Sequence, residues 1–184
     1  MLFKPKFEGP ENMKIYLKMI PKISEEIVKT LSRDGDIIVG SESIDEAALD
    51  ATAVLRSYVE EERKLLEEVK ERMEARGQSP KDFPRVRDAL AKERDFKLGD
   101  EGIDFVIDQI IEIFMSSPNI DEVFAEDHTM RKKIFDILKR FLDVDEGLDR
   151  MARDRLKNLE EGTIDWDIAY EKTINQLKQN KKLI

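Results

Sequence analysis

The sequence predicts an all-α protein made of two tandem four-helix repeats, and three observations lead to this prediction. Apolar residues recur at intervals of three and four, the spacing of amphipathic helices, most clearly over Met130–Leu142. Charged residues make up 40% of the 184 residues, while only 8 Gly and 6 Pro interrupt the chain. Such a composition is typical of long solvated helices. The apolar stripe of Met130–Leu142 also occurs 83 residues earlier, over 47–58.

The chain divides into an N-terminal arm and two repeats. Residues 1–12 contain Pro and Gly and show no apolar period, which indicates an extended arm. The first repeat is expected over residues 13–95 and the second over residues 96–184. The two align without a gap and keep their helical stripes in phase, which indicates an internal duplication. The identical pairs are Ile20 with Ile103, Ile27 with Ile110, Leu55 with Leu138, Leu65 with Leu148, Arg72 with Arg155 and Asp82 with Asp165.

Each repeat is expected to contain four helices, stacked or related by a pseudo-two-fold axis. Pro21 is compatible with the opening turn of the first helix. Ser43 and Glu46 predict a capping box before the second, Gly77 is a residue that commonly ends a helix, and Ser79 begins the fourth. The only candidate for β structure is the segment 37–39. In the first repeat the four helices cover 20–31, 47–58, 65–73 and 80–90.

The composition excludes several classes of function. The formal net charge is −9 and neither half is basic, which disfavours binding to nucleic acid. The chain has no cysteine, so it has no disulfide framework and no thiolate chemistry. No apolar run approaches the roughly 20 residues that span a membrane, and we expect a cytoplasmic protein. The high content of Glu, Lys and Arg is the composition of a thermostable protein.

One segment resembles a known family. Residues 162–170, GTIDWDIAY, place Trp166 and Tyr170 four residues apart behind a small polar residue. This pattern closely resembles the end of a bacterial family of unknown function, number 507 in the series of such domains. The repeat starts MKIYLKMIPKI and FKLGDEGIDFVI and the turn RDGDIIV are also similar. The resemblance implies two tandem copies of an all-helical, bacterial unit and no known activity.

Two aromatic residues and one histidine are candidates for a site. Trp166 and Tyr170 lie one helical turn apart and predict an interaction surface, although such a pair more often anchors a helix in a core. His128 is the only histidine and stands with Asp127 and Thr129 where a helix N-cap belongs, which favours capping over metal binding. No second histidine exists to build a zinc site with it.

Four carboxylates supply an enzymatic alternative. Helical magnesium-dependent nucleotide pyrophosphohydrolases place E-x-x-E on one helix and E-x-x-D on a later one, because carboxylates three residues apart share a helix face. Glu68 and Glu71, followed by Glu101 and Asp104, match this pattern. Among 41 acidic residues, however, such spacings arise freely.

The leading interpretation is therefore a non-catalytic protein-interaction or structural module. It has no predicted catalytic residue, cofactor or metal, and Trp166 and Tyr170 are its candidate surface. Its expected partner is a protein, with no nucleic acid and no membrane. The oligomeric state, the partner and any substrate stay open.

Overall fold

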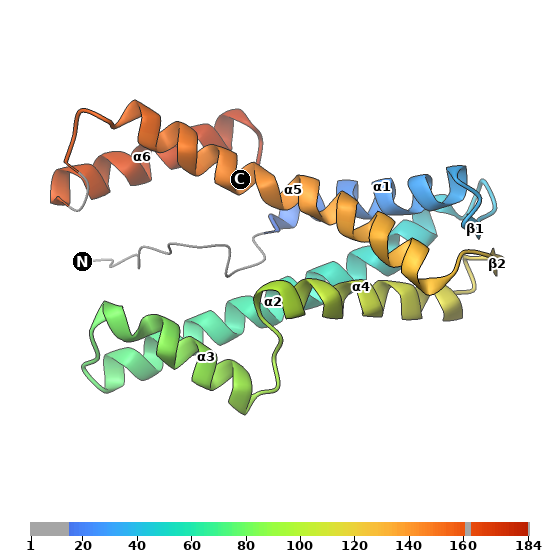
Figure 1. The fold of residues 1–184 in the computed structure, drawn as a ribbon, viewed down its shortest axis with the longest axis horizontal. Helices are drawn as coiled ribbons and strands as arrows, with labels where there is room; N and C mark the ends of the chain where they lie inside the picture. The colour runs from blue at the N-terminus through green and yellow to red at the C-terminus, as the bar shows by residue number, and fades with distance from the viewer. Residues whose placement is uncertain (1–14, 161–162, 184) are drawn as a thin grey trace.

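The computed structural model describes residues 15–160 and 163–183, and these residues are almost entirely helical (Figure 1). This confirms the all-α prediction. The predicted arm, residues 1–12, lies outside the described residues. Two short 3₁₀ turns, Leu17–Met19 and Pro80–Asp82, precede α1 and α3. The other elements are α1 Ile20–Arg33, β1 Ile37–Ile38, α2 Ile44–Ala75, α3 Phe83–Glu93, α4 Gly99–Ser116, β2 Glu122–Val123, α5 Asp127–Arg155 and α6 Ile164–Asn180.

The prediction of four helices in each repeat is wrong, because α2 is one continuous helix where two were expected. Residues 59–64 interrupt the apolar stripe with charged side chains but contain no Gly or Pro. Glutamate, arginine and lysine favour helix as strongly as most apolar residues do, so the backbone continues. An ion pair one turn apart, between Lys64 and Glu61, spans the polar stretch. The described chain thus has three helices before residue 95 and three after it.

The order helix, strand, long helix, helix occurs twice along the described chain. The two long helices begin at Ile44 and Asp127, positions 83 residues apart. The strands β1 and β2 pair antiparallel, with Ile37 opposite Val123 and Ile38 opposite Glu122, and so join the two halves. This confirms the predicted extended segment near residue 37. Its partner strand was not predicted.

One hydrophobic core lies where both halves meet. It contains α1, α4 and the first parts of α2 and α5. Each long helix contacts the first helix of the other half, α2 against α4 and α5 against α1. Ile27, Leu55, Ile110 and Leu138 are all fully buried in this one cluster. The two halves therefore share a single apolar interior at this end of the molecule.

Beyond the core, the chain forms two separate hairpins that diverge in Figure 1. In one, α3 folds back on the end of α2; in the other, α6 folds back on the end of α5. Each hairpin has its own small apolar cluster. The first contains Leu65, Val69, Met73, Phe83, Leu90 and Ala91, and the second Leu148, Ala152, Leu177 and Leu183.

The helix ends follow the predicted signals with one exception. Pro21 lies in the first turn of α1, and Gly77 follows α2 with a φ of 60°. Ser79 and Asp82 form a reciprocal capping box before α3. Ser43 is the N-cap of α2, but its side chain makes no capping hydrogen bond, so the predicted capping box with Glu46 is not formed. Within residues 15–160 and 163–183, no helix combines the length and apolarity needed to cross a bilayer.

Candidate functional site

The predicted aromatic pair lies at the start of α6. Thr163 caps this helix, and its side chain accepts a hydrogen bond from the backbone N–H of Trp166 at 3.3 Å. The indole of Trp166 is only 4% exposed, while Tyr170 is half-buried. The two rings stack with centroids 4.9 Å apart and planes 13° apart.

Polar side chains of α5 hold this pair in place. The Arg153 guanidinium lies 5.7 Å from the Trp166 ring centroid and 6.0 Å from that of Tyr170, within range of a cation–π contact. The Tyr170 hydroxyl donates to Asp149 Oδ1 at 2.5 Å, and Arg153 Nε donates to Asp149 Oδ2 at 2.8 Å. These contacts anchor α6 on α5. The predicted surface around the two aromatics stays a prediction, and the exposed apolar neighbour between them is Ile168.

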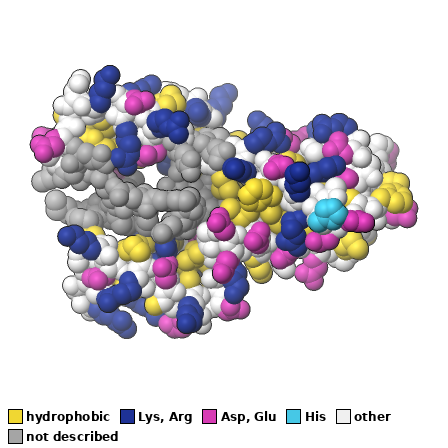
Figure 2. Space-filling model, viewed as in Figure 1, with side chains coloured by type: hydrophobic (Ala, Val, Ile, Leu, Met, Phe, Trp, Pro, Cys, Tyr) yellow, Lys and Arg dark blue, Asp and Glu magenta, His cyan; other side chains and the backbone are white. Residues whose placement is uncertain are grey.

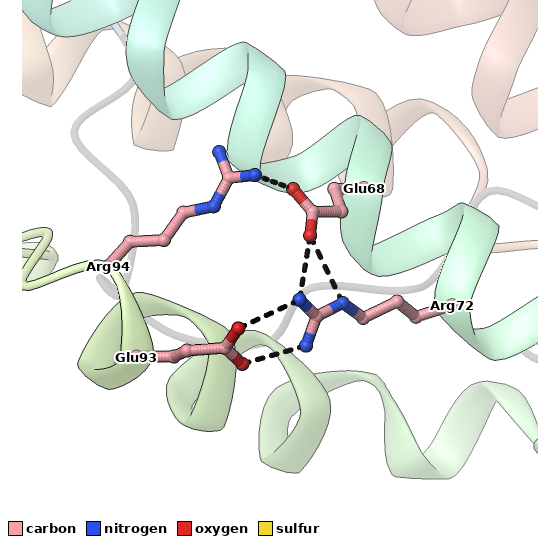
Figure 3. A network of polar contacts seen from close by, with 4 residues as sticks. All are labelled: Glu68, Arg72, Glu93 and Arg94. Carbon is pink, nitrogen blue, oxygen red and sulfur yellow. Dashed lines mark hydrogen bonds and ion pairs between the residues drawn. The ribbon is translucent and has the colours of Figure 1, made fainter.

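The four carboxylates of the enzymatic alternative are not assembled into a metal site. Glu68 is engaged by two guanidiniums, since Arg72 Nη2 donates to it at 2.8 Å and Arg94 also bonds it (Figure 3). Glu101 and Asp104 are exposed on α4. Among the residues that the structure describes, no group of three or more His, Cys, Asp or Glu side chains could hold a metal ion.

An ion network closes the same surface between α2 and α3. Arg72 Nη1 donates to Glu93 Oε2 at 2.9 Å, so this arginine bridges Glu93 and Glu68 (Figure 3). The Arg72 hydrogen bond lowers the pKa of the Glu93 carboxyl. An open concavity of about 610 Å³ lies over the network, and its charged lining neutralises itself. The lining residues are Lys64, Glu67, Glu68, Glu71, Arg72, Ala75 and Arg94.

His128 lies in the first turn of α5 and not at its cap. The N-cap position is taken by Glu126, and no side chain there makes a capping hydrogen bond, so the predicted capping role is wrong by one to three positions. The exposed His128 ring places Nδ1 3.2 Å from the Glu126 carboxylate. A histidine one residue inside the helix points to solvent and cannot reach the free backbone N–H groups of the first turn.

A family model matches residues 13–183 of the chain and describes a protein of unknown function, DUF507. The chain belongs to the DUF507 family. This confirms the resemblance found at residues 162–170 and at the repeat starts. The match is a single range through both halves, so the whole described fold falls within it. No curated protein matches the chain.

The surface of this DUF507 protein carries a feature that the sequence reasoning missed. Among the described residues, ten large apolar side chains are exposed, and seven of them lie after residue 95. Figure 2 shows a group of hydrophobic side chains over the region between α4 and α5. A comparison of the two halves at non-core positions could have found this signal. The seven residues are Phe105, Met115, Phe124, Phe135, Met151, Leu159 and Ile168.

Proposed function

We propose that this DUF507 protein is a non-catalytic interaction module that arose by internal duplication, and that its second half binds a protein partner. One observation carries the proposal: the exposed apolar side chains of the second half have polar counterparts in the first. Counting back 83 residues from the seven exposed positions gives Lys22, Ser32, Ser41, Thr52, Glu68, Arg76 and Arg85.

The duplication is supported by two contacts at equivalent positions. Lys133 on α5 donates to Asp36 at 2.5 Å and to Asp34 at 2.9 Å, in the turn after α1. Subtracting or adding 83 converts these three residues into Asp50, Ser117 and Asn119. Asp50 on α2 accepts hydrogen bonds from both of those side chains, in the turn after α4: Ser117 Oγ at 2.5 Å and Asn119 Nδ2 at 3.2 Å. A duplicated fold with an approximate two-fold axis explains why the same crossing occurs twice.

The exposed apolar side chains favour binding over chemistry. Large apolar side chains on a soluble protein lose free energy in water at about 25 cal/mol per Å² and are enriched where a partner covers them. Met115, Ile168 and Phe124 are 66%, 64% and 57% exposed. Charged residues surround them along α4, α5 and α6, as at the rim of a protein interface. The predicted aromatic pair contributes by fixing α6, which presents Ile168.

The test is a comparative capture experiment in extract of the source cells. Four exposed apolar residues are replaced by their first-half counterparts, as Phe135→Thr, Met151→Glu, Leu159→Arg and Ile168→Arg. These sites are at the surface, so each change should leave the helical circular dichroism unchanged. We expect the tagged wild-type chain to retain a defined set of proteins, identified by mass spectrometry, and the fourfold variant to lose it.

The matched control uses the exposed apolar residue of α2. Leu49 is 63% exposed, and its second-half counterpart is Lys132. Leu49→Lys should leave the retained set unchanged, because the proposal assigns binding to the second half. An identical set of proteins for the wild type and the fourfold variant contradicts the proposal.

A further inference from the structure

Helix α4 presents a face of unusual chemistry. Its sequence contains five acidic residues and no basic one. Five exposed positions spaced four, three, four and three residues apart form one stripe, here called the α4 stripe. Three of its members are carboxylates and two are large apolar side chains, Phe105 at 44% and Met115 at 66% exposure. The stripe consists of Glu101, Phe105, Asp108, Glu112 and Met115.

The first half supplies a reference for this stripe. Its counterparts are Lys18, Lys22, Glu25, Lys29 and Ser32, three of them basic. On that surface the charges neutralise one another, as in the ion pair of Lys29 with Glu25. On α4 all three lysine positions have become acidic or aromatic. Because the two helices share their place in the fold, packing does not require the acidic and apolar side chains of α4.

Helix α5 extends the apolar part of this surface. Arg131 on α5 bonds Asp108 on α4, which shows that these two positions face each other. The two helices run in opposite directions (Figure 1), so Phe135, one turn after Arg131, lies toward Phe105, one turn before Asp108. Phe135 is 38% exposed. Two aromatic side chains therefore lie beside one another, with the carboxylates of the α4 stripe along them.

From this arrangement we infer that the α4 stripe and Phe135 bind a basic amphipathic helix of a protein partner. This inference rests on the proposed function and names the chemistry of the partner. An amphipathic helix places apolar side chains at intervals of three and four, which matches the Phe105 to Met115 spacing. Lysine or arginine side chains flanking its apolar stripe meet Glu101, Asp104 and Glu112. Complementary charge speeds association and fixes the orientation of the bound helix.

The same charge argument separates this partner from other occupants. Five carboxylates and no cation on α4 repel the phosphates of nucleic acids and of anionic membranes. A second copy of the chain is the remaining alternative, because the counterpart surface of its first half carries Lys18, Lys22 and Lys29. Its positive charges there stand beside Glu25 and Glu26, which lie on α1 as well and weaken such a contact.

The test uses a synthetic helical peptide of about 18 residues, long enough to follow α4. It carries leucines on one stripe and lysines beside them, and its binding is measured by fluorescence anisotropy. We expect the wild-type chain to bind this peptide, with an affinity that falls as salt rises. A peptide with glutamates in place of the lysines, and one with serines in place of the leucines, should each bind at least tenfold more weakly.

The matched variants exchange α4 for its counterpart. Glu101→Lys, Phe105→Lys and Glu112→Lys together should weaken binding of the lysine peptide at least tenfold. Lys18→Glu, Lys22→Ala and Lys29→Glu, on the other half, should leave it within twofold. Equal binding of the lysine and glutamate peptides, or an α4 variant that binds like wild type, overturns the inference. A dimer in analytical ultracentrifugation that the α4 variant dissociates also overturns it, in favour of a second copy.

The two proposals fail separately. If the fourfold variant with Met151→Glu and Ile168→Arg loses its captured proteins while the α4 variant keeps them, the module still binds a partner but not through α4. If the lysine peptide binds the α4 stripe while the capture experiment shows no difference, the stripe is a site and the wider second-half surface is not.

Discussion

The two halves of this chain differ more at their surfaces than in their interiors. At the shared core, Ile27 and Leu55 have identical counterparts in Ile110 and Leu138, and all four are fully buried. At the surface, no exposed large apolar position of either half is apolar in the other. Packing restricts the size and shape of a buried side chain, whereas an exposed one adds little to stability. The difference teaches that one fold serves both halves, while the surface that could bind a partner belongs to one.

A second difference lies at the contact of each long helix with the other half. Tyr58 on α2 is buried, and its hydroxyl donates to the carbonyl oxygen of Lys97 at 2.8 Å. Burial raises the pKa of this phenol, so it stays neutral as a donor. The hydroxyl fits because Gly102 has no side chain there. In the other half the counterparts are Phe141 and Met19, so the hydroxyl and the glycine are absent together.

Truncating the identical core residues should have the largest effect. Leu55→Ala and Leu138→Ala should each lower the free energy of unfolding by about 2–5 kcal/mol, through lost burial and a residual cavity. Since both side chains lie in one cluster, each variant should shift a single transition. Urea unfolding followed by circular dichroism measures this. A variant that shifts only part of the signal, and leaves a second transition unchanged, contradicts a shared core.

Filling the space beside Tyr58 should have the next largest effect. A Cβ at position 102 overlaps the Tyr58 hydroxyl and lies 2.8 Å from the Lys97 carbonyl oxygen. Gly102→Ala should therefore lower the free energy of unfolding by about 1–3 kcal/mol, although alanine is otherwise the better helix former. Thermal or urea unfolding gives the value.

Tyr58→Phe separates the two causes, because it brings this contact closer to the chemistry of Phe141. Alone it should cost about 1 kcal/mol through the lost hydrogen bond. Combined with Gly102→Ala it should cost less than the two changes added together, since the overlapping oxygen is gone. Rescue stays partial because the carbonyl contact remains. Strict additivity of the two changes contradicts the overlap as the reason for the glycine.

Much of the fold could be predicted from the sequence because helix signals are local. Pro21, Gly77 and Ser79 mark helix ends by their own backbone and side-chain properties, and the structure agrees. The continuous α2 could not be predicted from apolar spacing, because residues 59–64 are held helical by propensity alone. The pairing of β1 with β2 depends on two segments about 85 residues apart, so no local pattern contains it.

The candidate site was harder to predict because its signal is a difference. Trp166 and Tyr170 are conspicuous in the sequence, yet their burial depends on Asp149 and Arg153 of another helix. Phe105 is unremarkable until it is compared with Lys22, its counterpart on a helix of the same fold. Alignment of the halves by their identities emphasises the core. Their mismatches locate the surface.

The two crossings described above give the smallest and most specific prediction. Lys133 donates to Asp36 and Asp34, and these bonds raise the pKa of Lys133 and lower that of Asp34. An aspartate with a lowered pKa stabilises the fold above its ordinary value of 3.8 and loses that contribution as the pH falls through its lower folded value. A lysine with a raised pKa contributes below 10.5 and loses its contribution above.

Lys133→Gln should therefore lower the free energy of unfolding at neutral pH, and the loss should shrink in acid below about pH 4. Urea unfolding from pH 2.5 to pH 8 measures the difference between variant and wild type. Lys132→Gln removes the same charge from the exposed neighbouring position, so its difference should stay nearly constant over that range. At the other crossing the donors to Asp50 are the neutral Ser117 and Asn119. Ser117→Ala should therefore depend less on salt than Lys133→Gln, since added ions screen a pair of charges more than a hydrogen bond from a neutral group. An equal salt dependence at both crossings means that their different chemistry has no consequence for stability.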